Sequence, residues 1–237
     1  MRAKVACLAA FAVAMAFVEA ASVVYLRQII GEGPIFPMKE IPATLLVVEI
    51  SRETATIAML VLVAVLSVRG GLRRMGAFLL AFAVWDIFYY VWLYATIRWP
   101  AALADWDILF LIPLPWVGPV WSVLLISAGM IAFSVRFLGA PEDARFSPGP
   151  WGWASGVAGA GAIVATYMLE WKKIGYGAGL PKEFFLLPYF LGIALLFVSG
   201  CITYRNALPR GGQRSGISLL RTAGRPGAND DDPASRG

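Results

Sequence analysis

Histidine is absent from this sequence. Histidine is the common ligand of zinc, haem and di-iron centres and the base of Ser-His-Asp hydrolases, so its absence excludes these centres and that form of catalysis. A P-loop is also missing, which excludes ATP hydrolysis at a Walker-type site. No lysine lies in the middle of an apolar run, so a retinal Schiff base has no anchor. We therefore expect no cofactor.

Cysteine is nearly absent, since the chain holds only Cys7 and Cys201. Two thiolates on their own do not complete a zinc or iron–sulfur site. The topology derived below places both near the cytoplasmic face of a membrane, where thiols stay reduced. We therefore interpret both as small apolar packing residues, and we expect neither a disulfide nor a metal site.

Charge is scarce as well. Only 15% of the 237 residues are charged, whereas soluble domains carry about 25%. The chain is 59% hydrophobic with a mean hydropathy of +0.71, and its apolar runs are long enough to cross a bilayer as helices. The fold class that this composition predicts is an all-α integral membrane protein, with the lipid bilayer as its partner. The net charge of +5 comes from loops and a terminal tail, so we expect no nucleic-acid partner.

A bundle of about six transmembrane helices follows from these runs. Residues 97–112 are too interrupted to span, and we expect them to lie at the membrane interface or to re-enter it. Residues 205–237 are rich in Gly, Arg and Pro, which predicts a disordered cytoplasmic tail. The predicted spans are about 5–26, 43–68, 77–96, 113–135, 154–171 and 184–204.

Small residues and prolines refine two of these spans. The span at 113–135 begins among three prolines, which a helix tolerates in its first turn. In the fifth span Gly152, Gly156 and Ala160 recur every four residues, a pattern typical of closely packed membrane helices. We expect this face to pack within the chain rather than to form a dimer interface.

Orientation follows from the basic residues. Thirteen lysines and arginines fall on the side that holds both termini, against six on the other side. Cytoplasmic loops carry the excess of Lys and Arg in membrane proteins. We therefore predict a multi-pass protein with both termini cytoplasmic, and the Ala-, Gly- and Arg-rich composition favours a bacterial inner membrane.

Five charged residues fall inside the predicted spans. A charge at the centre of a span costs roughly 2.5–3.5 kcal/mol, so such residues persist mainly when they are paired or functional. The topology places all five in the outer half of the bilayer or near its midplane. They are Glu19 in the first span, Glu49, Arg52 and Glu53 in the second, and Asp86 in the third.

The spacing of these residues predicts a shared site. Residues three and four apart lie on one face of a helix, which groups Glu49 with Arg52 and Glu53, and Asp86 with Tyr89 and Tyr90. Four carboxyls against one guanidinium do not all ionise in an apolar interior, so one or more should hold an exchangeable proton. Such a site suits a ligand, an ion or a proton path. The candidate residues are Glu19, Glu49, Arg52, Glu53, Asp86, Tyr89 and Tyr90.

Other interpretations stay open at this point. The same charges can simply lock helices together. Asp105 and Asp107, beside Trp106, fit ordinary interfacial charges. The favoured hypothesis is a small transporter or proton- or cation-coupled permease. The alternatives are an accessory or assembly subunit, with partner membrane subunits or a homo-oligomer, and a membrane enzyme that acts on lipid-linked substrates through its carboxylates.

Overall fold

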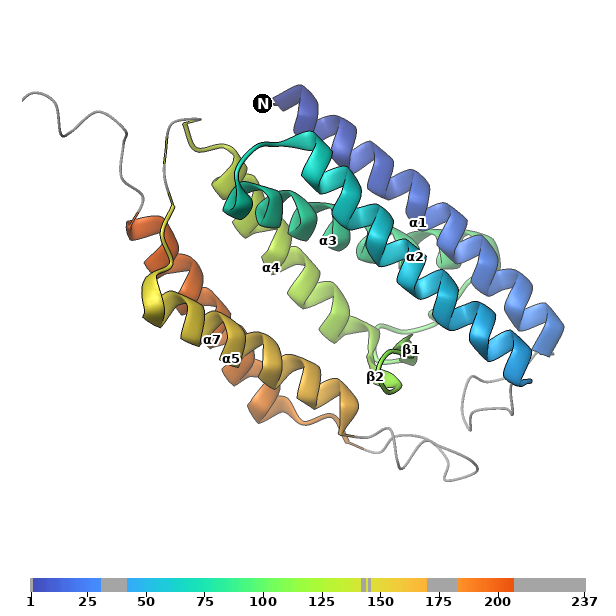
Figure 1. The fold of residues 1–237 in the computed structure, drawn as a ribbon. Helices are drawn as coiled ribbons and strands as arrows, with labels where there is room; N and C mark the ends of the chain where they lie inside the picture. Colours follow the sequence, from blue (N-terminus) through green and yellow to red (C-terminus); the bar gives the residue numbers. More distant parts are fainter. Residues whose placement is uncertain (1, 31–41, 142–143, 145, 170–182, 207–237) are drawn as a thin grey trace, which may run out of the picture.

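The structure is a computed structural model that describes residues 2–30, 42–141, 144, 146–169 and 183–206. Within these ranges most residues are helical, and two short strands form one antiparallel sheet (Figure 1). The elements are α1 (Arg2–Ile30), α2 (Ala43–Ser67), α3 (Gly71–Ile97), β1 (Trp106–Phe110), β2 (Trp116–Pro119), α4 (Val120–Leu138), α5 (Gly149–Met168) and α7 (Leu186–Arg205).

Five of the described helices are long and apolar enough to cross a membrane, namely α1, α2, α3, α4 and α7. Helix α5 has 20 residues, but its glycines, serine and tryptophans lower its hydropathy. It begins at Gly149 rather than at the predicted 154. The disordered tail predicted for 205–237 lies outside the described residues, apart from its first two positions, of which Arg205 ends α7.

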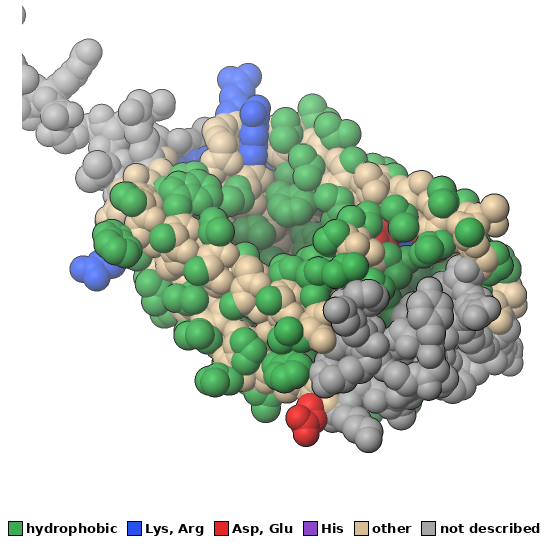
Figure 2. Space-filling view, turned by 60° about the horizontal axis from the view of Figure 1, so that its bottom comes forward, with side chains coloured by type: hydrophobic (Ala, Val, Ile, Leu, Met, Phe, Trp, Pro, Cys, Tyr) green, Lys and Arg blue, Asp and Glu red, His purple; other side chains and the backbone are tan. Residues whose placement is uncertain are grey.

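Helix α3 is the centre of the bundle and packs against α1, α2 and α4. Small residues allow the closest approach, because Ala12 and Ala16 of α1 and Ala77 and Ala81 of α3 are completely buried. Outside this core, hydrophobic side chains cover most of the face in Figure 2, and most of the visible charged side chains project at its margins.

Helices α5 and α7 form an antiparallel pair at one side of the bundle (Figure 1). A methyl group added at Gly159 would lie 2.7 Å from the carbonyl oxygen of Gly192, so only glycine permits this backbone approach. Gly152 and Gly156 also face α7, which confirms that the small-residue face packs within the chain. Ala160 is exposed, however, and its predicted place is taken by Gly159. A helix has about 3.6 residues per turn, so Gly159, seven residues after Gly152, lies on the same face as Gly152. Ala160, eight residues after Gly152, lies past that face.

The segment before α4 forms a β-hairpin, so the prediction of an all-α fold and of a helix starting at 113 is wrong here. β1 and β2 pair antiparallel, with Trp106 opposite Pro119 and Ile108 opposite Val117. The closely spaced prolines disfavour helix, because each lacks an N–H and pushes the preceding residue out of the helical region. Helix α4 begins at Val120, whose N–H donates to the carbonyl oxygen of Asp105 at 2.9 Å.

The bundle has two distinct ends. The hairpin end holds Ile30, Ala43, Ile97 and the β-hairpin, and the opposite, basic end holds Arg2, Gly71 and Arg205 (Figure 1). Among the described residues, the six helices run alternately up and down, so the N-terminus and the end of α7 lie at the same end.

Gly159→Ala should destabilise the protein, because the added methyl meets backbone atoms of α7. We expect a loss of about 1–3 kcal/mol in the free energy of unfolding, as for other overpacked sites. Gly161→Ala is the matched control, since nothing lies within 4 Å of its added methyl. Alanine favours helix, so this control should stabilise by up to about 1 kcal/mol. Thermal unfolding in detergent measures both, and equal behaviour of the two variants would contradict the close α5–α7 packing.

Candidate functional site

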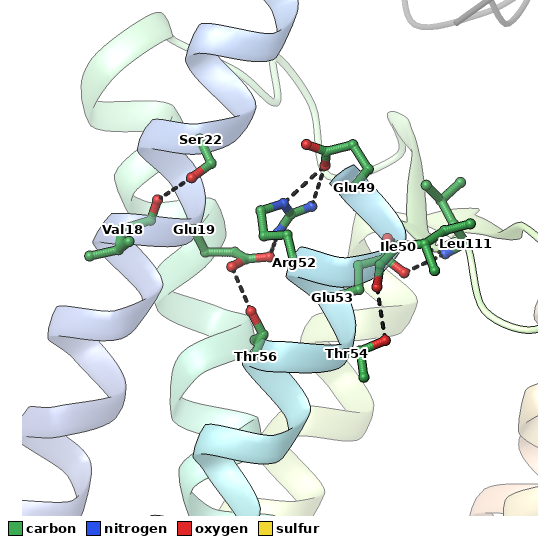
Figure 3. Close-up of polar contacts among 10 residues, drawn as sticks. All are labelled: Val18, Glu19, Ser22, Glu49, Ile50, Arg52, Glu53, Thr54, Thr56 and Leu111. Atoms are coloured by element: carbon green, nitrogen blue, oxygen red, sulfur yellow. Dashed lines mark hydrogen bonds and ion pairs between the residues drawn. The ribbon is translucent and has the colours of Figure 1, made fainter. Parts of the chain in front are cut away.

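An ion group joins α1 to α2. The guanidinium of Arg52 lies between two carboxylates, pairing with Glu19 of α1 and donating to Oε2 of Glu49 from Nε at 2.9 Å and from Nη2 at 2.7 Å (Figure 3). The hydroxyl of Thr56 donates to the second oxygen of Glu19 at 3.0 Å. Both glutamates are less than 10% exposed. Each of the two buried carboxylates is thus paired with a cation, as buried charges require.

Glu53 points away from this ion group and toward the β-hairpin (Figure 3). Its carboxylate accepts the backbone N–H of Leu111 at 2.9 Å and 3.2 Å, one distance to each oxygen. Glu53 lies ten residues into α2, which places it about 15 Å from the start of that helix. A side chain in the middle of a helix therefore holds the start of the hairpin turn beside α2, about 15 Å along the bundle from the hairpin end.

Asp86 connects α3 to α4. Its carboxyl accepts the hydroxyl of Ser127 at 2.6 Å, and Ser127 is fully buried. Asp86 lies eleven residues before the end of α3, about 16 Å from the hairpin end. Among the described residues, no lysine or arginine forms an ion pair with it. The contact that Asp86 makes is thus with a neutral donor.

Asp107 of β1 is the deepest acid of the hairpin and is 4% exposed. It accepts the phenol hydroxyl of Tyr90 at 3.1 Å. Burial raises the pKa of Asp107 from 3.8 to about 6, although nearby Arg27 and hydrogen bonds to the carboxyl, including that from Tyr90, act to lower it. Asp107 is therefore part of the interior and not an interfacial surface charge. Asp105 lies in a turn near the surface, where its carboxylate accepts hydrogen bonds from the backbone N–H groups of Ala101 and Ala102. This agrees with the interpretation of Asp105 as an ordinary interfacial charge.

The seven residues proposed from the sequence fall into two groups. Glu19, Glu49 and Arg52 meet in the ion group, with Glu53 on the neighbouring face of α2. Asp86 and Tyr90 belong to an acid–hydroxyl group, defined here as Asp107, Tyr90, Asp86 and Ser127. Tyr89 is within electrostatic range of members of both groups, since it interacts with Arg52 as well as with Asp107 and Asp86.

A cleft opens beside Glu53 between α2, α3 and the hairpin. Its volume is about 360 Å³. Glu53, Thr54 and Ile57 line it from α2, and Phe82 lines it from α3. The hairpin contributes Phe110, Ile112 and Trp116. The lining is therefore mostly apolar and aromatic around one carboxylate, with the Thr54 hydroxyl donating to the carbonyl oxygen of Ile50 and the indole N–H of Trp116 without a partner among the described residues.

Sequence reasoning missed the partners of the charged residues. Thr56 and Ser127 are each one of several Ser and Thr residues in their helices, and nothing in the sequence indicates which of these hydroxyls meets a distant carboxyl. Asp107 carried a weak signal, because an acid that alternates with apolar residues in a short strand faces one side of it. The Leu111 N–H carries no sequence signal, since every non-proline residue has such a donor.

Comparison with known proteins found no matching family model, no matching curated protein and no matching solved structure. Function is therefore argued from the residues alone. In the part of the chain that the structure describes, no three Asp, Glu or Cys side chains converge to hold a metal ion.

Arg52→Gln should destabilise the α1–α2 contact, because it leaves two buried carboxylates without a cation. Breaking a buried pair costs about 3–5 kcal/mol, and we expect about 3 kcal/mol for this half-buried guanidinium. The triple variant with Glu19→Gln and Glu49→Gln added should recover most of the loss, since no charge then remains. Arg98→Gln, at an exposed position, is the control. Unfolding in detergent measures all four proteins, and a stable single variant would refute the role given to Arg52.

Asp107 should make stability depend on pH. Its folded-state pKa of about 6 lies above 3.8, so the folded protein binds more protons between these values and loses stability as the pH rises through them. The loss is on the order of 2–3 kcal/mol. Asp107→Asn should make this fall in stability shallower and be the more stable protein near pH 7. Asp105→Asn should leave the fall as it is in the wild type, and an unchanged fall in Asp107→Asn would show that Asp107 does not contribute to it.

Proposed function

We propose that this chain is a six-span membrane protein and a small proton- or cation-coupled permease. Large hydrophobic side chains stand outward on several helices, among them Leu66 at 85% exposure and Phe197 at 71%, which suits a lipid environment. Helix α5 is paired with α7 along its length and would cross at the same depth. The start of α1 and the end of α7 share one end of the bundle, and the excess of Lys and Arg on that side makes it the cytoplasmic side of, most simply, a bacterial inner membrane.

The observation that carries the proposal is the position of Asp86. It lies about 16 Å from the hairpin end, half-way through an apolar core of about 30 Å, and its hydrogen bond is to a neutral hydroxyl. A carboxyl placed in this way marks an ion or proton pathway in membrane proteins. Asp107 and Tyr90 lie between Asp86 and the hairpin end. Side chains with exchangeable protons are therefore present from the hairpin end to the middle of the bundle.

Beyond Asp86 the buried face of α3 is apolar for more than two turns, before the buried Arg73 near the basic end. Between Asp86 and the basic end, the buried side chains of α3 down to Ala77 are apolar and include Leu80 and Val84. A polar route from one side that stops at the centre suits a carrier with alternating access and does not suit an open channel. Glu53 borders the same half of the membrane, where the cleft gives a substrate room beside a carboxylate.

Asp86→Asn should abolish transport without preventing folding, because asparagine still accepts the Ser127 hydroxyl but exchanges no proton. The purified protein is reconstituted into liposomes, and transient currents are recorded after jumps in pH, Na⁺, K⁺ or organic-cation concentration. We expect currents in the wild type and at most a tenth of them in Asp86→Asn. Asp105→Asn serves as the control and should behave as wild type. Full currents in Asp86→Asn, or none in the wild type under any jump, would refute the permease and favour an accessory subunit.

A further inference from the structure

The cleft beside Glu53 has features that specify a class of ligand. Its volume of about 360 Å³ falls in the range of small-molecule sites, about 300–1,000 Å³. Thr54 and Ile112 on its rim are exposed, so the cleft opens sideways from the bundle and not along its axis. In a bilayer this direction faces the hydrocarbon region, so a molecule that enters here must be largely apolar.

The charges around the cleft favour a cation. Glu19, Glu49 and Glu53 are close neighbours of one guanidinium, and Arg52 is already bound by the first two. The contact that fixes Glu53 is a backbone N–H, which leaves the carboxylate with an excess of negative charge. A bound cation beside Glu53 would balance this excess.

The rings around the cleft strengthen this preference. Phe82, Phe110 and Trp116 contribute three aromatic side chains, and their ring centroids form a connected set, at 6.2 Å between the first two and 5.5 Å between the last two. Aromatic faces attract organic cations through their quadrupole, most strongly where water is excluded. Aromatic rings around one carboxylate thus fit a quaternary ammonium or phosphonium group, which has apolar substituents and no hydrogen-bond donors.

We propose that the cleft lined by Glu53, Phe82, Phe110 and Trp116 binds a lipophilic organic cation that enters sideways from the bilayer. This inference rests on the proposed function for its membrane setting, and it names the substrate class of the permease. Glu53 is the counter-charge, the rings hold the apolar substituents, and Ile57 forms the wall of α2 behind them.

Binding is tested on the purified full-length protein in detergent, with tritiated tetraphenylphosphonium measured by equilibrium dialysis. We expect saturable binding at one site per chain and at least tenfold weaker affinity in Glu53→Gln. Ile57→Trp, which fills the cleft and leaves every charge in place, should lower the affinity to a similar degree. Glu183→Gln, an exposed glutamate away from the cleft, is the matched control and should bind within twofold of the wild type.

A second pair of probes separates charge from apolar contact. Benzyltrimethylammonium and its neutral carbon isostere neopentylbenzene have the same shape, and each is used to displace the tritiated cation. The ammonium should compete at least tenfold better. Equal competition, unchanged affinity in both Glu53→Gln and Ile57→Trp, or absence of saturable binding would overturn the inference. Binding as expected without any current in the liposome assay would refute the permease alone, and currents with Na⁺ or K⁺ without this binding would refute the cation site alone.

Discussion

The fold depends on how one arginine is held inside an apolar helix bundle. Arg52 cannot stay buried without counter-charges, and it obtains one from its own helix, Glu49, and one from the neighbouring helix, Glu19. The pairing fixes the rotation of α2, because the face that carries Arg52 must meet α1. Once that face is fixed, Glu53 is turned toward the other side, where the β-hairpin lies.

The hairpin follows from a second constraint, the satisfaction of backbone polar groups where water is scarce. A turn placed at this depth exposes N–H groups that an apolar environment does not satisfy. Glu53 accepts one of them, from Leu111, and the carbonyl of Asp105 accepts the first N–H of α4. Gly118 completes the fit, since any side chain there would meet the ring of Tyr167 at 2.6 Å. Helix α4 can therefore be shorter than α3, because the hairpin occupies the space beyond the N-terminal end of α4.

The sequence predicted the parts of this arrangement that depend on local spacing. Apolar runs located the long apolar helices, and the three-residue interval from Glu49 to Arg52 correctly placed both side chains in contact. The sequence did not predict contacts that depend on helix rotation and long-range packing. These are the contacts of Thr56 with Glu19, Ser127 with Asp86, and Tyr90 with Asp107. The hairpin was missed because a short apolar segment interrupted by prolines resembles a helix start, and its strands are defined only by their pairing.

The buried acids differ in the charge of the partner that each one contacts. Glu19 and Glu49 are bound to a permanent cation, so protonation of either would leave Arg52 with an uncompensated charge and weaken the bundle. Glu53 and Asp86 contact neutral donors, a backbone N–H and a hydroxyl, which continue to satisfy the carboxyl in either protonation state. They can therefore exchange a proton or a cation while the helices remain in place. Under the proposed function, structural and transport roles are thus divided among residues of the same chemical type by the charge of the partner that each one contacts.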